Sequence, residues 1–324
     1  MSVVPPGEHG GDGRAIAASL GLDPASVLDL SLSLNPFAPD PAPVVRRHLG
    51  AGALSRYPDR GDLNAAEGAL AEVLGVEARR VLITNGGAEA IALVAGELGR
   101  GWVEAPEFSL YARHLARLAP DGPRFRSDPH NPSGALATPG ATAEVWDEAF
   151  YPLATGRWSA PGRAATAVVL GSLTKVLACP GLRVGYAVVP EDDGESLGVA
   201  GLAARLARRQ PAWSVGSLAL AAVPDLLATA DPDGWARSVA AARDGLIEVL
   251  HRHGLAPVPS DANFVLVPGA GGLRDALARH GVVVRDCASF GLAGQVRIAV
   301  PGPEGLARLD AALERCGQQA GGAR

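Results

Sequence analysis

Lys175 is the only lysine in a chain of 324 residues that contains 29 lysines and arginines together. A guanidinium stays protonated and is a poor nucleophile, whereas a desolvated ε-amine loses its proton and attacks a carbonyl. Ser172 and Thr174 precede this lysine, and Arg183 follows it by eight positions. The group offers a nucleophilic amine beside hydroxyls and a fixed cation. The alternative is that the lysine is a chance survivor in an arginine-rich composition.

Three more polar features lie at predicted turns or strand ends. Asn85–Glu89 contains two glycines and opens a predicted helix, whose free N–H groups and positive dipole end favour a phosphate. Asn131 lies in an Asn-Pro-Ser-Gly turn, and Asp147 ends a predicted strand. Taken singly, these features are also an ordinary glycine-rich turn, a turn asparagine and a helix cap.

Together these groups meet the needs of one cofactor, pyridoxal phosphate. It requires an amine for its aldehyde, an anion for its ring nitrogen, a donor for O3′, an aromatic lid and a phosphate cup. Lys175 offers the amine, Asp147 the anion and Asn131 the donor, and Phe108 is the candidate lid. The candidate cup residues are Gly87, Ala88, Ser172 and Arg183.

On these motifs the chain resembles the fold-type I pyridoxal-phosphate enzymes of the aminotransferase class I/II superfamily. The resemblance implies that Lys175 binds the cofactor covalently, Asp147 pairs with its ring nitrogen and Arg183 grips its phosphate. Tyr57 matches a tyrosine that reaches the cofactor of a neighbouring subunit, which implies a homodimer. Arg297 matches an arginine that clamps the substrate carboxylate in bidentate fashion.

Within that superfamily, the chain resembles the L-threonine-O-3-phosphate decarboxylases of cobalamin biosynthesis, relatives of the histidinol-phosphate aminotransferases. The resemblance rests on His9-Gly10-Gly11, on Ser31–Pro36 with its Asn35, on Ser172–Arg183 and on Val284–Phe290. It implies that His9, Asn35 and Arg285 bind the substrate. The alternatives are that Arg285 is a surface residue at a strand end and His9 a flexible terminal residue.

The expected function is therefore a decarboxylase, a lyase that acts on a phosphorylated amino acid. Phe150 stands where many aminotransferases carry a tyrosine that binds O3′, which favours decarboxylation, although the adjacent Tyr151 offers a substitute. A histidinol-phosphate-type aminotransferase and a non-catalytic homologue of the same fold remain alternatives. The chain is short for this family between residues 111 and 131 and between 134 and 147, which predicts a missing or rudimentary strand or helix.

Composition excludes several other classes of protein. The net charge is −5 with acids and bases interspersed, which argues against nucleic-acid and membrane-surface partners. No apolar run approaches a membrane span, and the N-terminus does not resemble a signal peptide. Three cysteines without metal-ligand spacing indicate a reducing compartment and no metal site. We expect a cytoplasmic homodimer.

Strands and helices alternate along the first two thirds of the chain. Predicted strands at 81–83, 102–103, 144–147, 167–170 and 186–189 indicate an α/β fold with a mostly parallel, doubly wound sheet. Its carboxyl-terminal strand ends should hold the ligand. Long helices at 197–230 and 235–253, followed by three strands, predict a smaller α+β domain. The predicted division is an arm at 1–40, a compact large cofactor-binding domain at 41–199 and a small C-terminal domain at 200–324.

Overall fold

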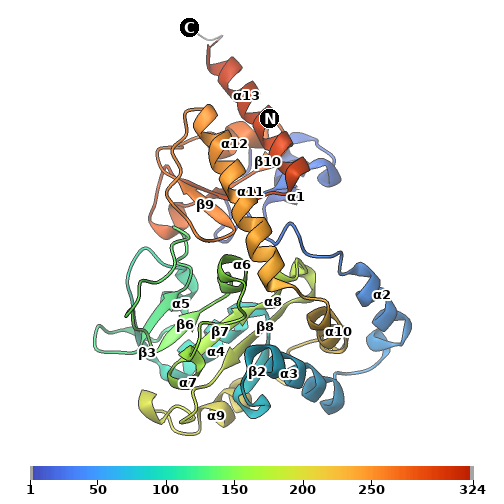
Figure 1. Cartoon of the computed structure of the whole chain (residues 1–324), viewed down its shortest axis with the longest axis vertical. Coiled ribbons are helices and arrows are strands. Elements are labelled where there is room, and N and C mark those ends of the chain that lie inside the picture. Colours follow the sequence, from blue (N-terminus) through green and yellow to red (C-terminus); the bar gives the residue numbers. More distant parts are fainter. Residues whose placement is uncertain (1–2, 322–324) are drawn as a thin grey trace.

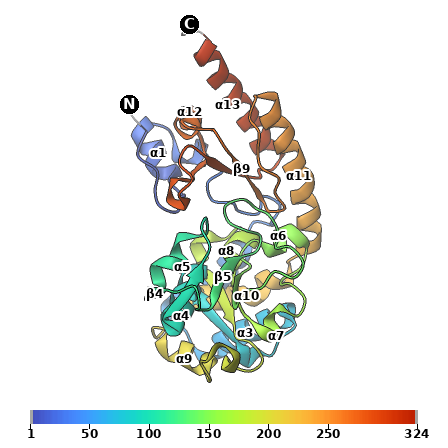
Figure 2. The same ribbon diagram turned by 90° about the vertical axis from the view of Figure 1, so that its left-hand side faces the viewer.

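The structure, a computed structural model, describes residues 3–321. Two lobes lie one above the other in Figure 1, and Figure 2 shows them after a quarter turn. The larger lobe is built on a seven-stranded sheet and the smaller lobe on a three-stranded sheet. Helix α11 (Pro232–Arg252) extends from the smaller lobe to the edge of the larger one.

The large sheet confirms the predicted α/β fold with a mostly parallel sheet. Its strands, in spatial order, are β2 (Val81–Asn85), β8 (Val184–Val188), β7 (Val168–Ser172), β6 (Val145–Asp147), β5 (Arg124–Ser127), β3 (Arg100–Val103) and β4 (Arg117–Leu118). Strand β8 runs antiparallel to both of its neighbours, and all other pairs are parallel. The carboxyl ends of β2, β7, β6, β5 and β3 therefore share one edge with the amino end of β8.

Helices cover both faces of this sheet, because its central strands are apolar on both sides. One core joins α3 and α10 to the sheet through Leu70, Val169 and Leu220, and the other joins α4 and α9 through Val94, Val168 and Leu202. The helices of this lobe are α2 (Ala42–Gly50), α3 (Arg60–Leu74), α4 (Gly86–Leu98), α5 (Ser109–His114), α6 (Tyr151–Thr155), α7 (Arg163–Thr166), α8 (Leu173–Val176), α9 (Leu202–Arg209) and α10 (Ser217–Ala228).

The shortened region of the chain affects helices rather than strands. Two strands that the sequence did not predict complete the sheet: β5 lies between β3 and β6, and β4 forms the edge beside β3. Helix α5 (Ser109–His114) has only six residues. The connection from β5 to β6, residues 128–144, contains no helix. The rudimentary elements are thus crossovers, and the strand ends that carry the predicted site residues are in place.

The smaller lobe combines residues from both ends of the chain. Its sheet has the antiparallel order β11 (Arg285–Asp286), β12 (Val296–Ala299) and β9 (Phe264–Val267). Beside it, β1 (Leu28–Asp29) pairs in parallel with β10 (Val282–Val283). The surrounding helices are α11 and also α1 (Gly13–Leu20), α12 (Leu273–Ala278) and α13 (Pro303–Gly321).

Contacts do not follow the predicted division at 1–40, 41–199 and 200–324. Part of the predicted arm packs in the smaller lobe, where Ile16 contacts Ala278 and Val283. The predicted helix at 197–230 is instead two helices, α9 and α10, separated by a segment that contains Pro211, and both pack on the large sheet. The division stays a prediction, and its residues 1–2 and 322–324 lie outside the described part.

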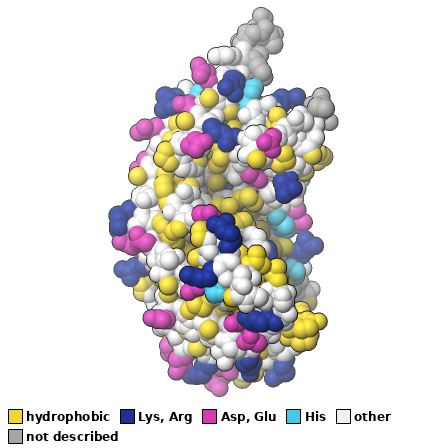
Figure 3. Space-filling view, turned by 90° about the vertical axis from the view of Figure 1, so that its right-hand side faces the viewer, with side chains coloured by type: hydrophobic (Ala, Val, Ile, Leu, Met, Phe, Trp, Pro, Cys, Tyr) yellow, Lys and Arg dark blue, Asp and Glu magenta, His cyan; other side chains and the backbone are white. Residues whose placement is uncertain are grey.

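The surface carries charges of both signs. Figure 3 shows the face on the right of Figure 1, where acidic and basic side chains alternate and hydrophobic side chains gather around the middle of the molecule. Within residues 3–321, no helix combines the length and the apolar character needed to cross a membrane.

Candidate active site

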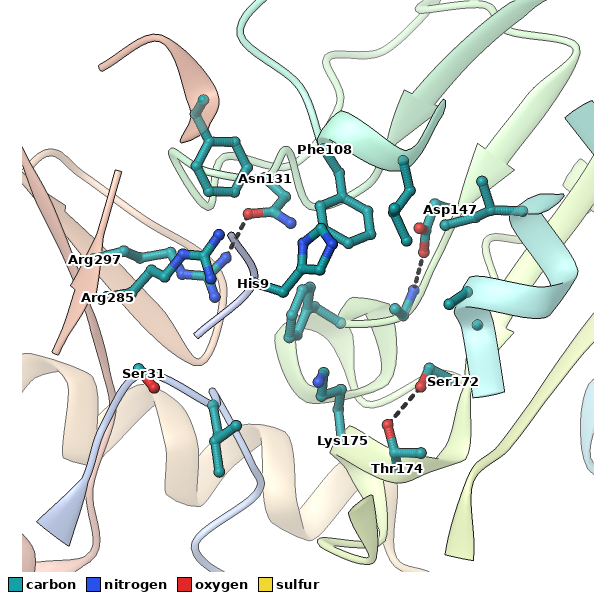
Figure 4. A pocket seen from close by; sticks show the side chains of 18 of the residues that line it. His9, Ser31, Phe108, Asn131, Asp147, Ser172, Thr174, Lys175, Arg285 and Arg297 are labelled. Carbon is teal, nitrogen blue, oxygen red and sulfur yellow. Dashed lines mark hydrogen bonds between the residues drawn. The ribbon is translucent and has the colours of Figure 1, made fainter. Parts of the chain in front are cut away.

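A cavity of about 260 Å³ lies between the two lobes, at the shared edge of the large sheet. Every predicted site residue except Tyr57 and Asn35 lines it (Figure 4). The large lobe contributes Gly87, Ala88, Phe108, Asn131, Asp147, Ser172, Lys175 and Arg183, and the rest of the chain contributes His9, Arg285 and Arg297.

Close backbone packing builds an anion-binding corner at the start of α4. Gly86 has a φ of +73°, and a Cβ there would collide with the Arg183 guanidinium. A Cβ on Gly185 would collide with the backbone of Gly86 and Gly87, so only glycines let β8 approach the helix. The Asn85 side chain makes no capping hydrogen bond to α4, and the Glu89 carboxylate accepts the N–H of Asn85, which precedes the first turn of this helix. Its free N–H groups and Arg183 therefore converge on one point, as an anion requires.

Lys175 lies in the turn after β7, with its Nζ pointing into the cavity (Figure 4). Its pKa is lowered to about 8, chiefly by burial and in addition by the charges of Arg297 and Arg183, whereas Asp147 opposes this shift. The amine is therefore far easier to deprotonate than an exposed lysine. The hydroxyl oxygens Ser172 Oγ and Thr174 Oγ1 are hydrogen-bonded to each other at 2.7 Å.

Asn35 supports the lysine segment from outside the cavity. Its backbone N–H donates to the Lys175 carbonyl at 3.0 Å, and its Nδ2 donates to the Val176 carbonyl at 2.9 Å. Its Oδ1 accepts from the N–H of Phe37. With these partners the side chain is buried and does not line the cavity, so the predicted contact with substrate has no counterpart in this geometry.

Asp147 faces the cavity from the end of β6 and is held at both oxygens. Oδ2 accepts from the Tyr111 hydroxyl at 2.8 Å, and Oδ1 accepts from the Ala149 N–H at 3.0 Å. Burial raises the pKa of Asp147, and these donors and the nearby Lys175 oppose the rise. Sequence analysis gave Tyr111 no role. The available signal was its spacing of three from Phe108, which puts both rings on one face of a short helix.

Asn131 is fixed between the lobes. Its Oδ1 accepts a hydrogen bond from Arg297 Nη1, which leaves its amide N–H groups as donors. Its backbone N–H donates to Ser127 Oγ at 2.8 Å. The turn then closes at Gly134, with φ +84°, where a side chain would collide with Ser260 of the smaller lobe. The Asn-Pro-Ser-Gly motif therefore docks one lobe on the other.

Arg285 and Arg297 are direct cross-strand partners on β11 and β12. Like charges in this position repel each other and destabilise a sheet. Both side chains are buried, at 3% and 6% exposure, and neither forms an ion pair with a carboxylate in residues 3–321. Arg285 Nε and Nη1 and Arg297 Nε have no hydrogen-bond partner. Two buried cations with free donors require an anionic ligand.

Phe108 and His9 also line the cavity, whereas Phe264 contacts Arg297 without lining it. Arg297 lies 4.4 Å above the ring centroid of Phe264, and the Phe108 ring contacts the edges of His9 and Tyr111. Burial lowers the pKa of His9, although the adjacent Glu8 opposes this, so the imidazole is largely neutral at pH 7.

Tyr57 and Tyr151 lie away from the cavity. Tyr57 is 74% exposed and stacks on Trp213 at 4.7 Å, a surface position where its predicted reach to another subunit stays a prediction. Tyr151 packs beside Arg163, whereas Phe150 lines the cavity. Tyr151 therefore does not substitute for the missing tyrosine.

Comparison with known proteins places these motifs in a family. The family described as "Aminotransferase class I and II" matches residues 127–315. Histidinol-phosphate aminotransferase of Halorubrum lacusprofundi is 31% identical over an alignment of 355 positions, which covers 93% of each chain. The same enzyme of Symbiobacterium thermophilum is 30% identical and covers 89% of this chain and 90% of its own.

Solved structures share the fold at lower identity. Histidinol-phosphate aminotransferase of Sinorhizobium meliloti, in complex with pyridoxal-5′-phosphate, has a TM-score of 0.77 at 20% identity and covers 99% of this chain and 96% of its own. L-threonine-O-3-phosphate decarboxylase of Porphyromonas gingivalis has a TM-score of 0.74 at 22% identity and covers 89% of this chain and 99% of its own.

Proposed function

The chain belongs to the aminotransferase class I and II family and is a pyridoxal-phosphate-dependent enzyme, and we propose that its substrate is a small phosphorylated amino acid. The favoured reaction is the decarboxylation of L-threonine O-3-phosphate, as in cobalamin biosynthesis. The observation that carries this proposal is the pair of buried, unpaired guanidinium groups of Arg285 and Arg297 in one small cavity.

The residues present fit the cofactor. The first turn of α4 and Arg183 form a corner suited to its phosphate, and Phe108 offers an aromatic face for its ring. Asp147 would pair with the ring nitrogen, and the free amide N–H groups of Asn131 would bind the ring hydroxyl. Lys175, the only lysine of the chain, would hold the aldehyde.

When bound, pyridoxal phosphate withdraws electrons from the bonds at the substrate α-carbon. The protein decides which bond is cleaved by orienting the substrate. Arg285 and Arg297 supply two cationic positions, one for the phosphate and one for the carboxylate. In decarboxylation, the bond from the α-carbon to the carboxylate breaks, carbon dioxide leaves and a proton takes its place. Lys175 Nζ, with a pKa of about 8, can carry that proton at neutral pH.

Substrate size and charge favour an amino acid of this kind. Threonine phosphate places a carboxylate and a phosphate on a four-carbon frame, so both arginines find an anion. The cavity of about 260 Å³ also has to hold the cofactor, which favours a compact substrate. Among the described residues, no tyrosine lines the cavity, so Asn131 is left as the amide donor for the ring hydroxyl.

A second candidate is the transamination of histidinol phosphate. Its support is the 31% and 30% identity to enzymes of that name over nearly the whole chain. Histidinol phosphate has no carboxylate, so one of the two arginines would be left for the dicarboxylate partner of the reaction.

Product analysis separates the two reactions. Purified holoenzyme is incubated with L-threonine O-3-phosphate, and in parallel with histidinol phosphate and 2-oxoglutarate, and products are identified by mass spectrometry. We expect loss of carbon dioxide in the first mixture and no glutamate in the second. A keto acid with pyridoxamine phosphate from threonine phosphate, or glutamate from histidinol phosphate, would reverse the assignment. Lys175→Ala should be inactive in both mixtures and serves as the control.

The proposal includes a cytoplasmic homodimer in which Tyr57 approaches the neighbouring cofactor. The stacked and exposed Tyr57 and Trp213 support a contact with another copy at this surface. Sedimentation of the wild-type protein and of Tyr57→Ser tests the assembly, and a wild-type monomer at working concentration would contradict it.

A further inference from the structure

Glu107 is a buried carboxylate behind the active site. The residue is 8% exposed and forms no ion pair with any residue in 3–321. It does not line the cavity. Its two oxygens instead accept three hydrogen bonds: from the Ser127 N–H at 2.8 Å, from Ser127 Oγ at 2.7 Å and from the Phe108 N–H at 3.2 Å.

The Ser127 hydroxyl links this carboxylate to Asn131. Ser127 Oγ donates its single proton to Glu107 and accepts the backbone N–H of Asn131 at 2.8 Å. A serine hydroxyl has only one proton to donate. Because Ser127 donates that proton to Glu107, a lone pair of Ser127 Oγ faces the backbone N–H of Asn131. A group that donated to Ser127 would compete with the Asn131 N–H for the same oxygen.

The other end of the carboxylate holds Phe108. Its N–H is bonded to Glu107 Oε2, and its ring lines the cavity and contacts His9 and Tyr111. Phe108 follows β3 and Asn131 follows β5. One carboxylate thus ties together the two loops that carry the ring-facing aromatic and the amide donor.

The placement of Glu107 is costly. The pKa of its carboxyl is raised to about 7, chiefly by burial and in addition by the charge of Asp147, while the three donors oppose the rise. Ionised carboxylates in such surroundings lose much of their hydration energy, which an apolar residue would not. Stability alone therefore does not account for an acid at this position.

We propose that Glu107 is a positioning residue for the cofactor. Glu107 acts on Asn131 through the Ser127 hydroxyl, and on Phe108 through the backbone N–H of Phe108. It fixes the loops after β3 and β5 in the geometry that grips the ring. The role applies to either reaction under "Proposed function", because it concerns the cofactor and not the substrate.

The test measures cofactor affinity and geometry in Glu107→Gln at pH 8. The amide keeps the shape of the side chain but replaces one acceptor with a donor. We expect the dissociation constant for pyridoxal phosphate to rise about tenfold, the loss of one hydrogen bond to a charged group. The visible circular dichroism band of the bound cofactor should weaken. The control is Glu104→Gln, which removes an exposed acid three positions away that pairs with Arg124.

A purely structural role gives a different result. In that case Glu107→Gln lowers the melting temperature of the apoprotein, but the cofactor affinity and the dichroism band stay at the level of the Glu104→Gln control. This outcome would overturn the proposal.

Ser127→Ala is the second variant, and it decides the question if Glu107→Gln does not fold. It removes the hydroxyl link and leaves the carboxylate in place. We expect weaker cofactor binding, and an unchanged dissociation constant would reject the link to Asn131. Where both variants fold, the double variant should lose less affinity than the sum of the two single losses, because both act on one link. Additive losses would contradict the proposal.

Discussion

The Tyr111 hydroxyl donates a 2.8 Å hydrogen bond to the Asp147 carboxylate, across a gap of 36 positions in the chain. Tyr111 lies on the short helix α5, which begins immediately after Phe108. Tyr111 is 1% exposed, and its ring meets the ring of Phe108 edge to face at 5.9 Å. One tyrosine thus orients Asp147, which is proposed to pair with the cofactor ring, and supports Phe108, which is proposed to face that ring.

Tyr111→Phe tests this relationship. The substitution keeps the ring and removes the hydrogen bond to a charged group, worth about 1.5–3 kcal/mol. We expect kcat/KM to fall by about ten- to a hundredfold and the visible absorption of the bound cofactor to shift. Tyr151→Phe, outside the cavity, is the control. Equal kinetics and spectra in the two variants would show that the Tyr111 hydroxyl is dispensable.

Lys175 should react with amine reagents at unusually low pH. Its pKa in the folded protein is about 8, against an ordinary value of 10.5, because burial and three arginines disfavour the charged form. In the apoprotein, trace acetylation of the peptide that contains Lys175, measured by mass spectrometry, should rise with a midpoint near pH 8. A midpoint near 10 would contradict the cavity environment.

The same shift affects stability in a defined direction. Between pH 8 and 10.5 the unfolded chain binds more protons at Lys175 than the folded chain does, so the free energy of unfolding of the apoprotein gains from this residue as pH rises. The difference in unfolding free energy between wild type and Lys175→Met should therefore move in favour of wild type across this range. A constant difference in urea titrations would disagree.

Gly86→Ala should disrupt the anion corner. The new Cβ would meet the Arg183 guanidinium, and φ at this position is +73°, which disfavours any residue with a side chain. We expect at least tenfold weaker binding of pyridoxal phosphate, measured by equilibrium dialysis. Gly68→Ala is the matched control, because it lies within α3 with no atom near its Cβ. That change should leave affinity unaltered and stabilise the protein by about 0.5–1 kcal/mol.

Arg163 stabilises the carboxyl ends of β5 and β6 without lining the cavity. It pairs with the buried carboxylates of Asp128, at 2.7 Å, and Glu148, and it stacks on Trp146 with 3.9 Å to the ring centroid. Arg163→Met leaves two buried acids without a cation, which should cost about 3–5 kcal/mol of unfolding free energy. The exposed Arg157→Met is the control for urea denaturation. A loss equal to that of the control would mean that the cluster contributes little.

The cavity residues were predictable because their positions follow from local order. Lys175 follows a predicted strand and Asp147 ends one, and parallel strands bring their carboxyl ends to one edge whatever their lateral order. Asn131 was predicted from its Asn-Pro-Ser-Gly turn. Glu107, Ser127 and Tyr111 were not assigned roles, because their hydrogen bonds depend on β3, β5 and β6 being neighbours. Nothing in the local sequence specifies that order.

Strand β5 was missed for a different physical reason. Its sequence, Arg124–Ser127, is polar and contains two arginines, unlike the apolar central strands β7 and β8. In the structure these guanidinium groups lie over the rings of Trp102 and Trp146, at 4.5 and 5.6 Å. The aromatic partners that make a polar strand suitable for the sheet come from β3 and β6 and are distant in sequence.

Because β8 runs antiparallel to β7, the connection between them is short and its length is fixed by the site. The connection beyond Asn131 is open, and its length can vary. After β7 the chain leaves the sheet edge at Ser172 and returns to the same edge at Val184, without crossing to the far side. Lys175 and Arg183 share this one short excursion, so an insertion between them would displace the amine relative to the phosphate corner. By contrast, residues 135–144 form an open connection beyond the Asn131 turn. Homologues of this chain can therefore lose or gain length there while the cofactor grip is preserved.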